Sequence, residues 1–561
     1  MSVRELAGQR SLVINGKVDA SNMGDMLTQR LLGLLPVLMH AHAERVLVLG
    51  LGSGVTAASV LAPGTTRALD VVEISPEVVK ASGFFRKENG DVLHRRGVNL
   101  IVGDGRSHLA LSSERYDVIV SEPSNPWMAG IAALFTREFF ETARARLRPD
   151  GIVCQWAHTY DISAGDLKSI VRTFTAVFPE STMWLVGDGD LLLIGTNGSS
   201  IQAHLDGLAA RAREGATASL LRDVDVRGQY LRFLLMSLFA GGPPQMRAYG
   251  GDAVLQTDDA MALEFSGPRA IYGRSNGDNA AEIRQMAAQG PAIAAARAEW
   301  DRAGDDAWAA AGAMEMKADA YTAAYDRYLR ALGINASNAE ALAGLSDAAA
   351  GARRTNDARD WLDARVRSDP SNANARIELS RLLAATGDME RAATLASEAI
   401  RLAPDDERAA LQLAAVCADA GDGKRLAAIA DALVARFPTL DRARVYRAQA
   451  KFLNGDTAQA IADMRQFVAA HPDVVQAQNL LGVACATSGD RDCASRAFAA
   501  ALRLNPRDAQ TYVNLGVLHM QSGDPAAAAE YFATAATLDR TSTAARQGLE
   551  EARAALASSS R

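Results

Sequence analysis

Three carboxylates of this chain end or closely follow short apolar runs that read as buried strands. They are Glu73, Asp104 and Glu122, and the last stands just after Tyr116–Val120, with Asn125 close behind it. Short apolar runs of this kind are typical of parallel strands buried on both faces. The carboxyl ends of such strands form the ligand crevice of an open α/β sheet. We therefore expect the acids to share one site, in which Glu122 and Asn125 decide the reaction.

The first apolar run leads into a glycine loop that could receive a nucleotide. Glycines let the backbone approach a ligand closely, and the N-terminus of the helix that begins near Val55 offers free N–H groups. Glu73, about 20 residues further on, can accept hydrogen bonds from both ribose hydroxyls. Asp104 closes the third strand beside Gly105, where an acid can accept from an adenine amino group. The loop residues are Gly50, Leu51, Gly52, Ser53 and Gly54.

Residues 1–200 alternate β-like runs with amphipathic segments, which predicts a doubly wound α/β sheet. A final pair of runs is joined by Gly187–Asp190, and we expect an antiparallel hairpin added at the sheet edge. Asp188 and Asp190 are interpreted as turn residues, since aspartates favour turn geometry. The predicted strands are Arg45–Gly50, Ala68–Glu73, Val98–Val102, Tyr116–Val120, Gly151–Trp156, Trp184–Val186 and Leu191–Ile194, and the clearest helices are Thr136–Leu147 and Ala164–Phe178.

From about residue 305 the chain becomes alanine-rich and repetitive. Prolines recur every 34 residues from Pro370 to Pro506, and glycines recur at the same interval from Gly387 to Gly523. A helix-turn-helix unit needs a glycine between its helices and a proline where the second helix stops, so both series have a physical cause. The period resembles tetratricopeptide repeats, and we expect seven units in 305–542. Such solenoids present a groove that binds a peptide or protein partner.

Composition argues against several kinds of partner and site. A net charge of −7 gives no support for nucleic-acid binding, and no apolar run is long enough for a membrane span. The four cysteines show no metal-ligand spacing, so we expect neither a metal site nor a disulfide framework, and a reducing cytoplasm as the location.

Residues 11–195 resemble the spermidine synthase (polyamine aminopropyltransferase) family, within the Rossmann-like class I S-adenosylmethionine-dependent transferases. Besides the glycine loop, the matching segments are Ile14–Gly16, Leu35-Pro36, Val72–Pro76, Gly103–Gly105, Tyr116–Pro126, Leu134-Phe135 and Gly151–Gln155. Of the family's small β-stranded N-terminal domain, only Ser11–Ile14 is expected here. The fused arrangement resembles bacterial proteins in which such a domain follows a transporter-like membrane region. Met1 then marks either a shortened piece of such a protein or a diverged relative.

The resemblance implies a donor, an acceptor and a base. The donor would be decarboxylated S-adenosylmethionine, the acceptor an amine, and the by-product methylthioadenosine. Glu73 would hold the ribose and Asp104 the adenine. Glu122 would take a proton from the attacking amine, which must be neutral to attack a sulfonium carbon. The residues expected around the acceptor are Gln29, Asn125, Gln155 and Tyr160, with His158 and Trp127 as neighbours that either line the pocket or pack.

Departures from the family pattern gather at amine recognition. The family's Asp-Ser-Ser-Asp-Pro is Glu122-Pro-Ser-Asn125-Pro here, the loop aspartate is Ser53, and a later acid is Ala157. Since dications need paired carboxylates to offset desolvation, these losses argue against a diamine and for a changed acceptor or donor.

Three hypotheses remain open at this stage. The first is aminopropyl transfer to an amine. The second uses intact S-adenosylmethionine for methyl or aminocarboxypropyl transfer, or for intramolecular cyclisation or lyase chemistry. The third is a non-catalytic nucleotide sensor that acts through its repeats. The predicted domains are the transferase domain at 1–200, an ordered connector at 201–304, the repeats at 305–542 and a capping helix with tail at 543–561; a homodimer and, if a transporter-like region precedes the chain, membrane association are left open.

Overall fold

The computed structural model describes residues 1–126, 128, 130–198, 200–212, 215–270, 278–288, 293–539 and 542–559. These residues form two compact units. The first comprises residues 1–5 and 9–354, and the second comprises residues 6–8 and 355–561. The boundary therefore falls after Arg354, beyond the predicted start of the repeats. The first helices of the repeat array pack with the α/β domain as one unit.

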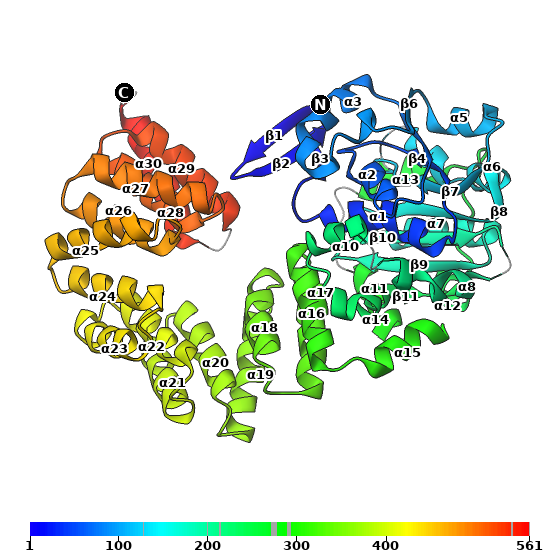
Figure 1. The fold of residues 1–561 in the computed structure, drawn as a ribbon. Coiled ribbons are helices and arrows are strands. Elements are labelled where there is room, and N and C mark those ends of the chain that lie inside the picture. Colours follow the sequence, from blue (N-terminus) through cyan, green and yellow to red (C-terminus); the bar gives the residue numbers. More distant parts are fainter. Residues whose placement is uncertain are drawn as a thin grey trace. The chain divides into compact units, whose positions relative to one another are not determined.

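An eight-stranded mixed sheet forms the centre of the first unit (Figure 1). Its order is β11-β9-β10-β8-β7-β4-β5-β6, and the five strands from β8 to β6 are parallel to one another, whereas β10 runs antiparallel to β8. The strands are β4 (Arg45–Leu49), β5 (Ala68–Glu73), β6 (Val98–Val102), β7 (Tyr116–Ser121), β8 (Leu147–His158), β9 (Ser181–Val186), β10 (Asp190–Thr196) and β11 (Phe239–Gly241).

The doubly wound sheet is confirmed, and alternation along its strands explains the layers. In β4, Leu47 and Leu49 face a core built with helices α6 (Arg137–Arg146) and α7 (Ala164–Val177). The opposite face is covered by α1 (Met26–Met39) and α2 (Val55–Leu61), which pack against each other. Because both faces are covered, apolar residues predominate in the parallel strands.

The chain reverses its winding direction between β4 and β7. It runs from β4 outward to β5 and β6, and then returns to place β7 on the other side of β4. Ligands of open α/β sheets bind outside the carboxyl ends of the strands at such a switch point. The glycine loop after β4 and Glu122 after β7 are therefore brought together by topology.

Two predictions about the sheet were wrong. The N-terminus forms a complete three-stranded sheet of β1 (Ser2–Leu6), β2 (Gln9–Ile14) and β3 (Lys17–Ser21) instead of one short strand. Its outer strand β1 is largely exposed, so it carries no apolar alternation that would reveal it. The β9–β10 hairpin is not the sheet edge either, because β11 pairs with β9 outside it.

The connector is ordered over its described parts. The segment 231–239 forms α11 (Leu231–Ser237) and then enters β11. Helix α12 (Pro243–Gly250) packs on α7. The other helices are α8 (Ile201–Asp206), α9 (Leu208–Arg211), α10 (Gly215–Arg222), α13 (Ala262–Ala270), α14 (Asp278–Ala288) and α15 (Ala294–Arg302); α3 (Pro76–Ser82), α4 (Arg86–Asn89) and α5 (Gly105–Leu111) lie in the sheet domain.

Seven antiparallel helix pairs follow, and their period is the one read from the sequence. The glycines from Gly387 to Gly523 have positive φ, as a turn between paired helices requires. The helices are α16 (Asp305–Lys317), α17 (Tyr321–Ile334), α18 (Ala339–Gly351), α19 (Thr355–Ser368), α20 (Ala373–Ala385), α21 (Met389–Leu402), α22 (Glu407–Asp419), α23 (Gly423–Arg436), α24 (Asp441–Leu453), α25 (Thr457–Ala470), α26 (Val475–Thr487), α27 (Arg491–Leu504), α28 (Ala509–Gln521) and α29 (Pro525–Leu538), with α30 (Thr543–Ser559) packed on the last pair.

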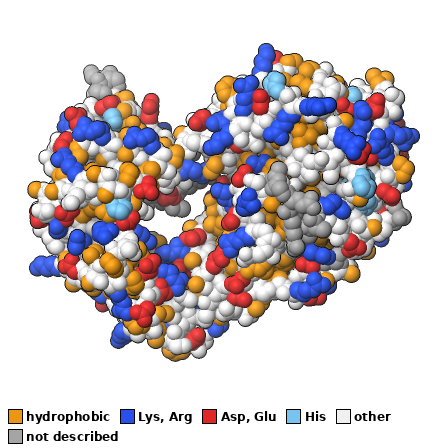
Figure 2. All heavy atoms as spheres, in the orientation of Figure 1, with side chains coloured by type: hydrophobic (Ala, Val, Ile, Leu, Met, Phe, Trp, Pro, Cys, Tyr) orange, Lys and Arg blue, Asp and Glu red, His pale blue; other side chains and the backbone are white. Residues whose placement is uncertain are grey.

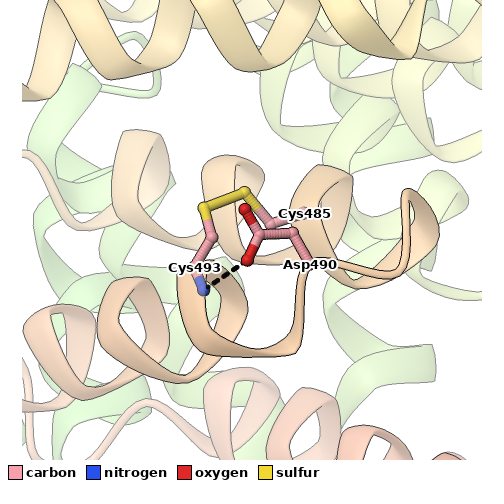
Figure 3. Close-up of side chains that lie close together, drawn as sticks. All are labelled: Cys485, Asp490 and Cys493. Carbon is pink, nitrogen blue, oxygen red and sulfur yellow. Dashed lines mark hydrogen bonds between the residues drawn. A yellow bond between two sulfur atoms is a disulfide. The ribbon is translucent and has the colours of Figure 1, made fainter.

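A disulfide joins Cys485 in α26 to Cys493 in α27 (Figure 3). The expectation that the cysteines stay unpaired was therefore wrong. A separation of eight residues suggests no bridge by itself, but the turn between paired helices brings these two positions face to face. Beside them, Asp490 accepts a hydrogen bond from the Cys493 backbone nitrogen at 3.0 Å. Cys154 and Cys417 are buried free thiols.

Charge is mixed over the surface. Figure 2 shows acidic and basic side chains interspersed on the visible face. Across the helices that the structure describes, none is both long and apolar enough to cross a membrane.

The disulfide predicts a redox dependence of stability in the second unit. Because the bridge restricts the unfolded chain, reducing it should lower the free energy of unfolding by about 2–3 kcal/mol. Thermal unfolding of the full chain with and without a phosphine reductant measures this effect. The Cys485→Ser/Cys493→Ser variant is the control and should not respond to the reductant. Identical melting of the oxidised and reduced wild-type protein would contradict the prediction.

Candidate functional site

The glycine loop and the residue after β7 touch through their backbones. The Glu122 backbone nitrogen donates to the Leu49 carbonyl at 2.8 Å, which extends the β4–β7 pairing by one residue. Gly50 has φ of 95°, and a Cβ there would overlap the Glu122 carbonyl oxygen. Gly54, with φ of 82°, precedes α2 as its N-cap. Glycine is thus required at position 50 by both conformation and space.

Glu73 at the end of β5 holds the glycine loop in place. Its carboxylate accepts from the Leu51 backbone nitrogen at 2.9 Å and from the Ser75 backbone nitrogen at 2.8 Å. Burial raises the pKa of Glu73, and these two backbone hydrogen bonds oppose the rise. Each oxygen keeps a further lone pair, so the same carboxylate could also accept from a ligand hydroxyl.

Among the three predicted acids, Asp104 is the exposed one. It is exposed at the end of the edge strand β6, where it caps α5 by accepting from the Ser107 backbone nitrogen at 2.7 Å. The next residue, Gly105, packs closely on Leu49, since a Cβ there would lie 3.2 Å from the leucine side chain. A contact between Asp104 and the adenine of a bound nucleoside therefore stays a prediction.

Glu122 carries a buried carboxyl group with one oxygen unpaired. Among the described atoms, its Oε2 has no hydrogen-bond partner. Burial raises the pKa of Glu122 to about 8, and the charges of Asp19, Asp25 and Glu73 add to the rise. A carboxyl with a pKa near neutrality can exchange a proton with a bound ligand at physiological pH.

Further polar atoms without a described partner belong to residues in or just after β7 and β8. These are adjacent parallel strands, in which Ser121 pairs with Gln155. A buried polar atom without a partner costs roughly 1–3 kcal/mol, so a cluster of them indicates a site completed by a polar ligand. The atoms without a described partner are Ser121 Oγ, Asn125 Oδ1, Gln155 Oε1 and His158 Nε2.

A chain of hydrogen bonds links the glycine loop to a carboxylate that the sequence analysis missed. The Ser53 hydroxyl donates to Gln29 Oε1, and Gln29 Nε2 donates to Asp25 Oδ2 at 3.0 Å. Asp25 also accepts from the Ser21 backbone nitrogen at 2.7 Å. Burial raises the pKa of Asp25 to about 6, and the charge of Asp190 contributes. Ser53 is therefore linked through the Gln29 side chain to the carboxylate of Asp25.

Asp190 belongs to the same group, although we expected a turn residue. Its carboxylate accepts from Thr28 Oγ1 at 2.6 Å and from Trp156 Nε1 at 3.2 Å. Burial raises its pKa to about 6. The turn interpretation was wrong because Asp190 is already the first residue of β10, where it pairs with His158 and points at α1. Asp188 remains in the turn, where its carboxylate accepts hydrogen bonds from the backbone nitrogens of Thr322 and Ala323.

Two more groups complete this end of the site. Asp19 of β3 accepts from the Ser124 hydroxyl at 2.5 Å, and burial raises its pKa. Tyr160 stacks on His158 with ring centroids 4.5 Å apart. Burial raises the pKa of Tyr160 well above its ordinary value, with Asp190 and Asp25 adding to the effect. Trp127 lies outside the described residues.

We name Asp19, Asp25, Glu122 and Asp190 the carboxylate cluster. In the part of the chain that the structure describes, no lysine or arginine forms an ion pair with any of the four. The loss of acids from the family motifs led us to expect that a diamine is disfavoured. Asp19, Asp25 and Asp190 supply three further carboxylates from other elements, which that expectation did not count. These three acids lie on an edge strand, in a loop and at the start of a strand, and together they form no sequence motif from which a shared site could be predicted.

The comparisons with known proteins concern the two parts of the chain separately. Residues 26–187 match the family described as spermine/spermidine synthase domain, and residues 344–407, 446–492 and 486–545 match a tetratricopeptide repeat family. The chain therefore carries a spermine/spermidine synthase domain followed by tetratricopeptide repeats.

Individual relatives match about three tenths of this chain. A polyamine aminopropyltransferase of Lachnoclostridium phytofermentans is 26% identical over 31% of this chain and 62% of its own length. Polyamine aminopropyltransferase 2 of Hyperthermus butylicus is 30% identical over 31% of this chain and 59% of its own. Putrescine N-methyltransferase 2 of Nicotiana tabacum is 30% identical over 30% of this chain and 48% of its own. The chain thus spans about three fifths or less of these relatives.

The raised pKa values predict how stability depends on pH. The folded protein holds protons on Glu122, Asp25 and Asp190 that the unfolded chain releases above about pH 4. Without a ligand, the first unit should lose stability as pH rises from 5 to 8, through the pKa values of about 6 and about 8. The Asp190→Asn variant should melt about 2–4 °C above the wild-type protein at pH 8 and close to it at pH 4.5.

The control for this experiment is Asp259→Asn, which neutralises an exposed carboxylate. It should leave the pH dependence of melting unchanged. A wild-type melting temperature that stays constant or rises between pH 5 and 8 would contradict the assignment of buried, uncompensated carboxyl groups.

Proposed function

We propose that this chain is a transferase that moves an aminopropyl group from an adenosyl sulfonium donor to an amine acceptor and releases methylthioadenosine. The observation that carries the proposal is the carboxylate cluster at the switch point of the sheet, with unpaired polar atoms beside it. Buried carboxylates without protein cations are a site for a cationic ligand. An amine acceptor that carries more than one positive charge is such a cationic ligand.

The nucleoside of the donor would bind at the glycine loop, on the side of Glu122 opposite the amine acceptor. Gly50, Gly52 and Gly54 open the backbone next to the N-terminus of α2, and Glu73 presents a carboxylate fixed by two backbone nitrogens. These features support binding of an adenosyl group with its ribose at Glu73. Asp104 and Gly105 would border the adenine. The donor's sulfonium then lies between the loop and the cluster, near Asn125.

The transfer step follows from these positions. The nitrogen of the neutral acceptor attacks the propyl carbon bound to sulfur, a C–N bond forms, and the C–S bond breaks. The electron pair of that bond returns to sulfur, which leaves as the neutral thioether of methylthioadenosine. The proton lost by the nitrogen passes to Glu122. Gln29, Gln155 and Tyr160 would hold the rest of the acceptor, together with Asp25 and Asp190.

Methyl transfer from intact S-adenosylmethionine is the second candidate, favoured by the similarity to a relative named putrescine N-methyltransferase. Intact S-adenosylmethionine carries a carboxylate that its decarboxylated form lacks. Four acids gather near the reacting centre, so like-charge repulsion favours the decarboxylated donor.

The nucleoside product distinguishes the candidates. The full chain is incubated with 1,4-diaminobutane and, in separate reactions, with decarboxylated or intact S-adenosylmethionine, and the products are identified by mass spectrometry. Methylthioadenosine together with an aminopropylated amine is the expected result. S-adenosylhomocysteine would instead establish methyl transfer, and binding of either donor without any product would favour a nucleotide sensor.

Glu122 gives the proposal a sharper prediction. Because a base must be deprotonated, kcat/KM should rise with pH up to about 8, the pKa of this carboxyl group. Glu122→Gln should lower kcat by roughly 10²–10⁴-fold and remove that limb of the pH profile. Glu141→Gln, on the exposed part of α6, is the matched control. A Glu122→Gln variant with wild-type kcat would show that another group takes the proton.

The repeats of the second unit would hold a protein partner. A cavity of about 460 Å³ opens along α22, α24, α26 and α28, lined by apolar side chains and by amides such as Gln449, Gln476 and Gln510. Amide side chains can pair with the peptide backbone, so an extended polypeptide segment fits this surface.

A further inference from the structure

The second helix of most repeat pairs begins at an aspartate that caps it. Asp388, Asp422, Asp456, Asp490 and Asp524 occur at the 34-residue period, and each side chain accepts from a backbone nitrogen in the first turn of its helix. In the first pair the same position is Ala320, which has no side chain to do so. The first pair therefore lacks a cap that the repeat pattern supplies elsewhere.

Asp188 of the β9–β10 turn takes the place of that cap. Its two carboxylate oxygens accept from the backbone nitrogens of Thr322 at 3.0 Å and of Ala323 at 2.9 Å, in the first turn of α17. The turn also packs on the helix start, since a Cβ at Gly187 would lie 3.6 Å from that of Ala320. The α/β domain thus supplies, through Asp188, the helix cap that the first repeat pair does not have at position 320.

The turn between α16 and α17 also touches the loop that carries Asp25. A Cβ at Gly24 would lie 2.8 Å from the Asp319 carboxylate and 3.3 Å from the Ala318 carbonyl oxygen. Gly24 precedes Asp25, and Asp188 stands two residues before Asp190. One short turn of the first repeat therefore contacts both loops that carry these two members of the carboxylate cluster.

Buried contacts anchor α16 and α17 where this happens. Arg327 of α17 donates to the Ser237 carbonyl at 2.6 Å, and Trp308 of α16 packs edge-on against Phe233 and Trp300. Burial raises the pKa of Glu315 to about 7, while Arg327 and a backbone hydrogen bond from Gly187 oppose the rise. The first pair is therefore held to the α/β domain by several independent interactions.

We propose that the first helix pair of the repeats is a positioning element of the amine site, and that Asp188 fixes Asp25 and Asp190 by capping α17. The role of these two acids in amine binding rests on the proposed function. The structural coupling does not, because it concerns only how two loops are held. Asp188 is a positioning residue: it does not touch the acceptor but sets the place of residues that do.

The test compares two cap deletions in the full chain. Asp188→Ala removes the shared cap, and Asp422→Ala removes an ordinary cap of a later repeat. Hydrogen exchange measured by mass spectrometry should speed up in residues 22–29 and 186–192 of Asp188→Ala and not of Asp422→Ala. With decarboxylated S-adenosylmethionine, Asp188→Ala should raise KM for 1,4-diaminobutane roughly tenfold and leave KM for the donor and kcat near wild-type values.

Asp188→Asn retains an acceptor for one of the two nitrogens and should give an intermediate KM, as expected for a positioning role. Unchanged exchange in residues 22–29 of Asp188→Ala would overturn the coupling, whatever reaction the chain performs. Faster exchange there with an unchanged KM for the amine would overturn the positioning role while leaving the proposed function intact. Absence of product from the wild-type protein would count against the proposed function alone, since the exchange measurement still decides the coupling.

Discussion

Negative charge without a protein counterion is the constraint on which this molecule depends. Four carboxyl groups, from β3, the loop before α1, the loop after β7 and the start of β10, meet at the point where the sheet reverses its winding. Each would be more stable in water, and burial raises the pKa of every one of them. The surrounding structure must hold these groups against their preference for solvent, and a bound cation relieves the strain.

The means of holding them are hydrogen bonds from neighbouring elements. Thr28 and Gln29 are adjacent on α1 and bind Asp190 and Asp25, so one helix turn fixes two acids. Gln29 also ties this pair to the glycine loop through Ser53. The first repeat pair supports the same loops from outside. The glycine loop, the carboxylate cluster and the start of the repeats are therefore joined by one continuous set of contacts.

Much of this could be predicted from the sequence, and the limits have clear causes. The parallel strands were predictable because both faces are buried, and the repeats because helix pairs need a glycine and a proline at fixed intervals. Glu73, Gly50 and Glu122 could be placed because they stand at strand ends. Asp190 and Asp25 could not, since their burial depends on α1 packing beside a hairpin far away in the chain. Cys485 and Cys493 were missed for the same reason: only the helix pairing brings them together.

Proton release on amine binding tests the central claim most directly. If the carboxylate cluster receives a polycation, Asp25, Asp190 and Glu122 must ionise as it binds. Calorimetric titration of the protein with 1,4-diaminobutane at pH 6, where carboxyl groups with pKa values of about 6 are half protonated, is repeated in buffers of different ionisation enthalpy and measures the number of protons exchanged. The account predicts net release of protons to the buffer, reduced in the Asp190→Asn variant. Binding with no proton exchange, or with the same release in the variant, would contradict it.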